Sequence, residues 1–391
     1  MRTPDSNTTT DQLLITSFFC LETFTRHLLM AVIPLDLLSH LGNTQHVTLF
    51  YAVVAIFGLG NSILVPLLLQ RLGIRLIVAA SGVFITVAAA LLASESLISI
   101  ALGLFFRVLG TACIEIPLIA YIMDRIPRNR LSAFEPKRIF FQGCCLAIAP
   151  WLGFQLHEHV SVGTPFVVTA MGGLAILGLA LLALPVTVPN TGSTALIRRP
   201  ADTVRRFYQQ PRLRLAWTLA MIRASYWIIF SIYAPIFSVI CGWSPSAGAA
   251  VLSLGNASLF FVVVWGRLVR SIGARRVLMI GYALAATCLV LTGIAGLWAP
   301  QIAPLLLLGS AFGASMVDGP GNIAFLRAAR PRERPSMTGI YMTYRDVSQF
   351  APIAAFSLIL LVAPLPSAFL VFAGAMFAAA RLSLLIHPRI R

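Results

Sequence analysis

Residues 70–75 read Gln70-Arg71-Leu72-Gly73-Ile74-Arg75, and they separate an apolar stretch near 47–69 from a second one near 76–94. A helix needs about 20 mostly apolar residues to cross the hydrocarbon layer of a membrane. Both stretches have about this length, and the link between them is short and basic. The sequence therefore predicts two consecutive membrane spans joined by a short charged loop.

The composition extends this prediction to the whole chain of 391 residues. Apolar residues make up 58% of the chain and charged residues only 11%, whereas a soluble domain carries about 25% charged residues. We therefore expect an all-α integral membrane protein. Twelve stretches of spanning length can be marked, near 12–41, 47–69, 76–94, 99–123, 139–156, 165–187, 215–240, 246–269, 277–297, 302–326, 338–362 and 366–386.

The positions of the cations predict the orientation of these spans. Lys and Arg number 29 against 13 Asp and Glu, for a net charge of +16. Most of them fall in every second break and in the segment 188–214, while the alternate breaks, such as 42–46 and 298–301, contain none. Basic loops stay on the cytoplasmic side, so we expect a multi-pass protein of the bacterial inner (plasma) membrane with both termini cytoplasmic. Charge divided among short loops argues against nucleic acid as a partner.

The two halves of the chain repeat each other at an offset near 200 residues. The stretch at 70–75 aligns with Arg270-Ser271-Ile272-Gly273-Ala274-Arg275, and Glu115-Ile116-Pro117 aligns with Asp318-Gly319-Pro320. The shared order of these matches predicts a duplicated unit of six helices. We expect a six-helix bundle at 1–187, a basic linker at 188–214 and a second six-helix bundle at 215–391, with pseudo-twofold symmetry between the bundles.

Over essentially its whole length the chain resembles the major facilitator superfamily. The loop signature of that family, Gly-x-x-x-Asp-Arg-x-Gly-x-Arg, is similar in the first half to Gln70, Arg71, Gly73 and Arg75, with Gln70 in place of the Asp. In the second half it is similar to Gly266, Arg270, Gly273 and Arg275. The resemblance implies a twelve-helix transporter that works by alternating access, in which these loop residues govern conformation.

Two charged residues in the first predicted span are candidates for function. Burying a charge at the centre of a spanning helix costs about 2.5–3.5 kcal/mol on insertion scales, so each one needs a reason. Glu22 and Arg26 lie four residues apart on one helix face. They either neutralise each other as a structural ion pair or line a cavity, with Glu22 carrying a proton and Arg26 binding substrate. Both can hold if substrate competes for Arg26.

The fourth span carries Arg107 and Glu115, eight residues apart. The resemblance implies a proton-transfer role for Arg107, and Glu115 is a candidate for proton coupling. A structural ion pair between helices is the alternative for both residues.

The tenth span contains Asp318-Gly319-Pro320-Gly321-Asn322. Proline removes a backbone donor, and an interrupted helix in a membrane is tolerated only against protein or a watery cavity. Asp318 is therefore a candidate for proton coupling and Asn322 for substrate binding, with a simple kink as the alternative reading.

The remaining candidates lie on the spans that the resemblance implies to surround a central cavity. We expect substrate binding by arginines, aromatic residues and amides, although aromatic residues on a helix face are more often packing. Arginine can hold a carboxylate or phosphate through two hydrogen bonds. These candidates are Arg223, Tyr226 and Trp227 on the seventh span, Tyr341, Tyr344 and Arg345 on the eleventh, Gln142 on the fifth and Asn256 on the eighth; Asp346 joins the candidates for proton coupling.

The sequence favours secondary transport of a small organic molecule. Ala149-Pro150-Trp151-Leu152-Gly153 is similar to part of a motif of drug antiporters, which favours proton-coupled efflux by antiport. Proton-coupled import of an organic anion or another small metabolite is the alternative, and a membrane sensor or scaffold on the same fold is a further one. No catalytic motif, nucleotide-binding loop or metal-type spacing occurs, so we expect no enzyme activity, no cofactor and no metal. We expect a functional monomer in the lipid bilayer, with the substrate and H⁺ as partners.

Overall fold

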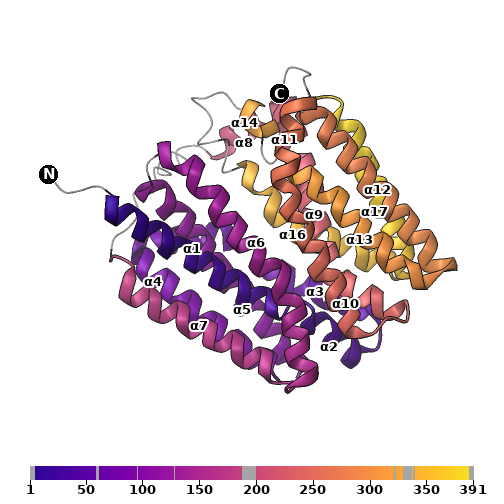
Figure 1. Ribbon diagram of the computed structural model, residues 1–391, viewed down its shortest axis with the longest axis horizontal. Coiled ribbons are helices and arrows are strands. Elements are labelled where there is room, and N and C mark those ends of the chain that lie inside the picture. Colours follow the sequence, from indigo (N-terminus) through magenta and orange to yellow (C-terminus); the bar gives the residue numbers. More distant parts are fainter. Residues whose placement is uncertain are drawn as a thin grey trace. The chain divides into compact units, whose positions relative to one another are not determined.

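The computed structural model describes residues 5–58, 61–94, 96–126, 128–186, 200–320, 323–328, 337 and 340–386 (Figure 1). These residues are almost entirely helical and contain no strand. The helices of the first half are α1 (Asp5–Leu28), α2 (Val32–Leu41), α3 (Thr44–Gly58), α4 (Asn61–Leu92), α5 (Leu97–Arg125), α6 (Arg128–His159) and α7 (Thr164–Ala183).

The second half begins with a short helix in the predicted linker. Its elements are α8 (Pro200–Gln209), α9 (Pro211–Ile240), α10 (Pro245–Ala257), η2 (Ser258–Phe261), α11 (Val262–Ile272), α12 (Ala274–Trp298), η3 (Pro300–Ile302), α13 (Ala303–Asp318), α14 (Ile323–Ala328), α16 (Tyr344–Ile359) and α17 (Leu365–Ser383).

Ten stretches of the described helices are long and apolar enough to cross a membrane. The two other predicted spans are present in shorter pieces. The span predicted near 47–69 is covered by α3 and the start of α4, and the span near 338–362 is covered by α16, which has 16 residues. The expected all-α membrane fold of twelve spans is therefore confirmed.

Several predicted spans are interrupted rather than continuous. The first is divided into α1 and α2 by a turn at residues 29–31. Pro34 explains this break, because it has no amide N–H to donate to the carbonyl four residues earlier. In the same way, the tenth predicted span ends as α13 at Asp318, directly before Gly319 and Pro320.

The chain forms two compact units. The first consists of Met1–Ile33 with Val53–Thr191, and the second consists of Pro34–Ala52 with Gly192–Arg391. The segment Pro34–Ala52 is held in the second unit by a buried hydrogen bond of 2.8 Å, which the Tyr233 hydroxyl donates to Thr48 Oγ1.

Corresponding helices pack against each other in both units. In the first unit α4 packs on α5 and α7, and α1 packs on α6. In the second unit α12 packs on α13 and α17, and α9 packs on α16. In each half, the third span therefore contacts the fourth and sixth, and the first contacts the fifth, as an internal repeat requires.

Among the described residues, four glycines with positive φ mark the same two turns in each half. They are Gly42 (φ 65°), Gly73 (φ 77°), Gly242 (φ 85°) and Gly273 (φ 89°). The two members of each pair are 200 residues apart (242 − 42 and 273 − 73). Side chains other than glycine rarely adopt this backbone conformation. Gly73 and Gly273 lie inside the two basic loop motifs, and Gly73 separates the two helical parts of α4.

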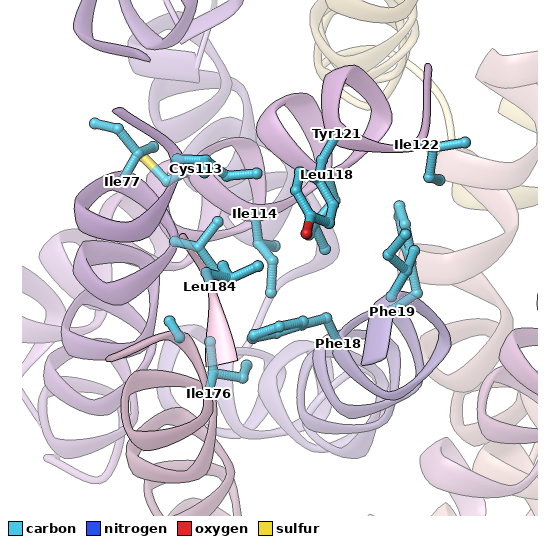
Figure 2. Close-up of a cluster of buried hydrophobic side chains, with 14 of the residues drawn as sticks. Phe18, Phe19, Ile77, Cys113, Ile114, Leu118, Tyr121, Ile122, Ile176 and Leu184 are labelled. Atoms are coloured by element: carbon cyan, nitrogen blue, oxygen red, sulfur yellow. The ribbon is translucent and has the colours of Figure 1, made fainter. Parts of the chain in front are cut away.

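The apolar core of the first unit lies between α1, α4, α5 and α7. Figure 2 shows Phe18 of α1 beside Ile114 and Leu118 of α5, with Ile176 of α7 on another side. Each of these side chains is at most 1% exposed. This core fixes α1 against α5, which are the two helices that carry the charged residues of the first unit.

Candidate functional site

A charged cluster of three side chains lies in the first unit. Arg26 on α1 contacts two carboxylates, with its Nε 2.7 Å from Glu22 Oε1 and its Nη2 3.3 Å from Glu115 Oε1 on α5. One guanidinium group therefore bridges a residue of its own helix and a residue 89 positions away. The expected pair of Glu22 and Arg26 is present, and Glu115 extends it to a second helix.

The two sides of this cluster differ in exposure. The Glu22 side chain is only 1% exposed, whereas Arg26 is 30% and Glu115 is 27% exposed. Glu22 Oε1 and Arg26 Nε have no well-directed hydrogen-bond partner among the described residues, so charge attraction rather than an aligned hydrogen bond holds this contact. The contact between Arg26 and Glu115 is longer, and both of its side chains are partly exposed.

A hydrogen-bonded chain supports Glu22 from α6. Arg138 Nη1 donates to Gln142 Oε1 at 3.0 Å, Gln142 Nε2 donates to Thr23 Oγ1 at 2.8 Å, and the Thr23 hydroxyl donates to Glu22 Oε2 at 3.3 Å. Arg138 also lies 4.2 Å above the centre of the Phe19 ring, a cation–π contact. Gln142, predicted as a substrate-binding residue, thus acts here on the orientation of Glu22.

Arg107 on α5 contacts the backbone of α1. Its Nη2 donates to the carbonyl oxygen of Arg26 at 2.7 Å. The last turn of a helix leaves carbonyl groups without hydrogen-bond partners in the helix. Arg107 donates to one of these carbonyl groups near the end of α1. A cavity of about 10 Å³, close to the space of one water molecule, is lined by Glu22, Arg26, Arg107 and Thr111 together with apolar residues.

The second unit contains an ion pair at the corresponding place. Arg223 Nε on α9 lies 3.4 Å from Asp318 Oδ1 at the end of α13. Trp227 Nε1 donates to the other carboxylate oxygen, Asp318 Oδ2, at 2.8 Å. Arg223 is 12% and Asp318 23% exposed. The three residues, all singled out by the sequence, therefore meet in one group.

The ion pairs of the two units correspond through the internal repeat. Each pair joins an arginine on the first span of its half to a carboxylate on the fourth span. The pair is Arg26 with Glu115 in the first unit and Arg223 with Asp318 in the second. The aligned motifs Glu115-Ile116-Pro117 and Asp318-Gly319-Pro320 supply the two acids. In the first unit a second carboxylate, Glu22, also contacts the arginine.

Three aromatic candidates of the second unit lie in its packed interior. The Tyr226 hydroxyl lies 2.7 Å from Ser310 Oγ, and its ring stacks on Phe230 with centres 5.9 Å apart. Tyr341 stacks on Phe325 at 4.0 Å, and Tyr344 lies 5.1 Å from Tyr341. All three candidates are less than 10% exposed, so in this conformation they pack against protein.

The other candidates differ in how far they are exposed. Asn256 is buried on α10, and on α16 Arg345 is exposed while Asp346 is half-buried. Asn322 lies outside the described residues. In the loop motifs, Gln70, Arg71 and Arg270 are exposed, whereas Arg75, Gly266 and Arg275 are half-buried.

Sequence reasoning missed the residues that support the acids. Thr23 and Arg138 were not among the candidates. His27 was also missed: it is 4% exposed, and its Nδ1 lies 2.7 Å from the carbonyl oxygen of Thr23. The only signal was proximity along the chain, since Thr23 follows Glu22 and His27 follows Arg26. Among the described residues, no group of three or more His, Cys, Asp or Glu side chains has the arrangement of a metal site.

Comparison with known proteins identifies the kind of molecule that has this fold. The family model described as Major Facilitator Superfamily matches residues 17–353. No curated protein matches the chain by sequence.

Solved transporters share the fold along nearly their whole length. The nucleoside transporter NupG superposes with a TM-score of 0.75 at 13% identity, covering 96% of this chain and 98% of its own. A POT family transporter in complex with 5-aminolevulinic acid has a TM-score of 0.77 at 15% identity, covering 97% of this chain and 96% of its own. A D-xylose-proton symporter has a TM-score of 0.76 at 13% identity, covering 97% of this chain and 98% of its own. At such identities the likeness concerns the fold.

Proposed function

The chain belongs to the Major Facilitator Superfamily, and on that premise we propose that it is a proton-coupled secondary transporter of a small organic molecule that works by alternating access. The observation that carries this proposal is the repeated pairing of an arginine with a carboxylate, Arg26 with Glu115 and Arg223 with Asp318. Ionisable residues within membrane spans are costly, and they commonly belong to substrate pathways or proton relays.

Arg26 is the group through which substrate and proton binding become linked. An anionic group of the substrate takes Nη2 of Arg26 from Glu115, because that contact is longer and more exposed than the contact with Glu22. Guanidinium groups bind carboxylates and phosphates strongly through paired hydrogen bonds. Glu115 then lacks its cation, which favours uptake of a proton from solution. When substrate and proton leave on the other side, Glu115 returns to Arg26.

The second unit supports the same exchange with a different acid. Arg223 is held by Asp318, and Trp227 fixes the second oxygen of that carboxylate. When a substrate anion binds Arg223 in place of Asp318, the carboxylate keeps the neutral Trp227 donor but loses its cation. A proton on Asp318 then replaces the lost positive charge. The half-buried Trp227 ring beside this pair favours a substrate with a flat apolar part.

This exchange makes substrate and proton bind together, which is the logic of symport and favours import of an organic anion. Antiport in the direction of efflux is the second candidate, favoured by the motif at Pro150 and Gly153 of α6. A Cβ atom on Gly153 would lie 1.8 Å from the carbonyl oxygen of Leu28, so the motif holds α6 close against α1. In that case a cationic group of the substrate takes the place of the proton on Glu115.

The orientation of the protein is part of the proposal. The Lys and Arg residues of alternate breaks support cytoplasmic termini and a location in the bacterial inner membrane. We propose that the functional form is a monomer.

The test is transport by the purified protein in liposomes with an imposed pH gradient. The labelled ligands are 5-aminolevulinic acid, an aromatic carboxylate, a nucleoside and xylose. Symport predicts accumulation when the outside is the acidic side, and antiport predicts accumulation when the lumen is acidic. A protonophore abolishes either.

Variants of the two acids test the residue assignments. Glu115→Gln and Asp318→Asn are each expected to lose accumulation driven by the pH gradient while they keep exchange of labelled for unlabelled substrate. Glu158→Gln is the matched control, because Glu158 lies 45% exposed at the end of α6. If both variants accumulate substrate as well as the wild-type protein does, the proposed role of the acids in coupling is wrong.

A further inference from the structure

A second charged region lies in the second unit, and none of its lining residues belongs to either ion pair. At the end of the second unit where α9 and α12 begin and α17 ends, a cavity of about 230 Å³ opens between helices. Arg212 of α9, Arg275 of α12 and Arg327 of α14 line it, together with Leu384, Leu385 and Ile386, which follow α17. In Figure 1, α14 lies at the upper end of the second unit.

Among the described residues, the lining of this cavity carries charge of one sign. Three guanidinium groups come from three different helices, and the described lining residues include no Asp or Glu. Like charges brought together repel each other, and they attract a counter-ion of the opposite sign. Three arginines around one cavity fit a phosphate group, since guanidinium groups bind phosphate oxygens in pairs.

The other residues that line the cavity are apolar. Leu384 is 42% exposed and Leu385 is 71% exposed, while Ile386 is 5% exposed. The cavity therefore combines three arginines with exposed leucines. Such a combination fits an amphiphile better than it fits a free ion.

The cavity lies at the boundary between the apolar spans and water. Arg212 and Arg275 are each the second residue of a candidate membrane span, Pro211–Ile240 and Ala274–Trp298, and Leu384 directly follows the span Leu365–Ser383. On the proposed orientation this boundary faces the cytoplasm. Anionic lipids concentrate in the cytoplasmic leaflet, and basic pockets between spanning helices on that side bind their headgroups.

We propose that this cavity is a binding site for the phosphate group of an anionic phospholipid. The three arginines hold the phosphate, and Leu384 and Leu385 lie along the first part of an acyl chain. The volume of the cavity fits a headgroup rather than a whole ligand molecule. It is about 230 Å³, whereas pockets that enclose a drug-sized ligand have roughly 300–1,000 Å³. A headgroup fills such a space while the chains remain in the bilayer.

The test measures lipid binding to the purified full-length protein in detergent, by native mass spectrometry and by thermal stabilisation. The probes are dioleoylphosphatidylglycerol, dioleoylphosphatidylcholine and inorganic phosphate. With about a five-fold contribution from each arginine, we expect a preference of roughly a hundred-fold for phosphatidylglycerol over phosphatidylcholine.

Single variants separate the cavity from the general basic surface. Arg212→Gln and Arg327→Gln are each expected to weaken phosphatidylglycerol binding roughly five-fold. Arg214→Gln is the matched control, because Arg214 is exposed on the same turn of α9 and does not line the cavity. Leu385→Ser is expected to weaken binding of the lipid and to leave binding of inorganic phosphate unchanged.

Three results overturn the proposal. Equal loss of affinity in Arg214→Gln shows attraction to the basic surface as a whole. Equal binding of phosphatidylglycerol and phosphatidylcholine shows that the arginines do not select an anion. Inorganic phosphate that stabilises the protein as well as the lipid does, with no effect of Leu385→Ser, shows a site for a soluble anion instead.

Discussion

Replacing Arg26 by glutamine removes the only cation that is described in contact with the Glu22 carboxylate. Glu22 is 1% exposed and its Oε1 lies 2.7 Å from Arg26 Nε. Removing one partner of a buried ion pair costs about 3–5 kcal/mol, because the other charge stays buried without compensation. Since Arg26 itself is 30% exposed, we expect the loss in free energy of unfolding to lie at the low end, at about 3 kcal/mol.

The double variant Glu22→Gln/Arg26→Gln tests the origin of that loss. It removes the buried carboxylate along with its cation, and Glu115, which is 27% exposed, keeps access to solvent. We therefore expect the double variant to recover about 2 kcal/mol relative to Arg26→Gln. The double-mutant cycle with Glu22→Gln measures this coupling energy directly.

The assay is unfolding in mixed micelles with increasing dodecyl sulfate, followed by the reaction of a thiol dye. Cys113 is 2% exposed in the core of the first unit, so it becomes reactive only when that unit opens. Arg214→Gln, which replaces an exposed arginine, controls for the loss of a positive charge. If the double variant is no more stable than Arg26→Gln, then Glu22 and Arg26 are not coupled and the account of the buried pair is wrong.

Two further variants each test one contact, the first in the second unit and the other in the first unit. Trp227→Phe removes the donor to Asp318 Oδ2 at 2.8 Å, and we expect unfolding to become easier by about 1.5–3 kcal/mol. Trp243→Phe is the control, because it removes an exposed hydrogen bond to a backbone carbonyl, and we expect it to change the free energy of unfolding little. If both variants lose the same stability, the hydrogen bond from Trp227 to the Asp318 carboxylate has no special strength. Gly153→Ala places a Cβ atom 1.8 Å from a backbone oxygen of α1 and is expected to cost about 1–3 kcal/mol in the same unfolding assay. Gly178→Ala is the control, because a Cβ atom at that position has nothing within 4 Å. If Gly153→Ala is as stable as Gly178→Ala, α6 does not approach α1 as closely at Gly153 as the structure shows.

The sequence was informative wherever the signal was local. Apolar length predicts the spans, and the basic stretches at 70–75 and 270–275 predict the turns that the structure has at Gly73 and Gly273. The aligned acids Glu115 and Asp318 were selected because a charge in a membrane span needs a reason, and both prove to be paired with arginine.

The partners of these acids could not be predicted from local signals. Arg26 and Glu115 are 89 residues apart, and only the packing of α1 on α5 brings them together. Arg138 was not among the candidates, because only the packing of α6 on α1 connects it to Glu22 through Gln142 and Thr23. Tyr341 and Tyr226 were candidates for substrate binding, yet they stack on Phe325 and Phe230 in the packed interior.

The spacing of the four positive-φ glycines has a consequence for the ancestry of the protein. Two reversals of the chain recur after 200 residues, Gly42 with Gly242 and Gly73 with Gly273, while the side chains around them have largely diverged. A gene for one half that doubled and fused leaves such a trace, because an inherited glycine in this conformation tolerates no replacement without strain. The two halves therefore have the same two turns although most of their side chains differ.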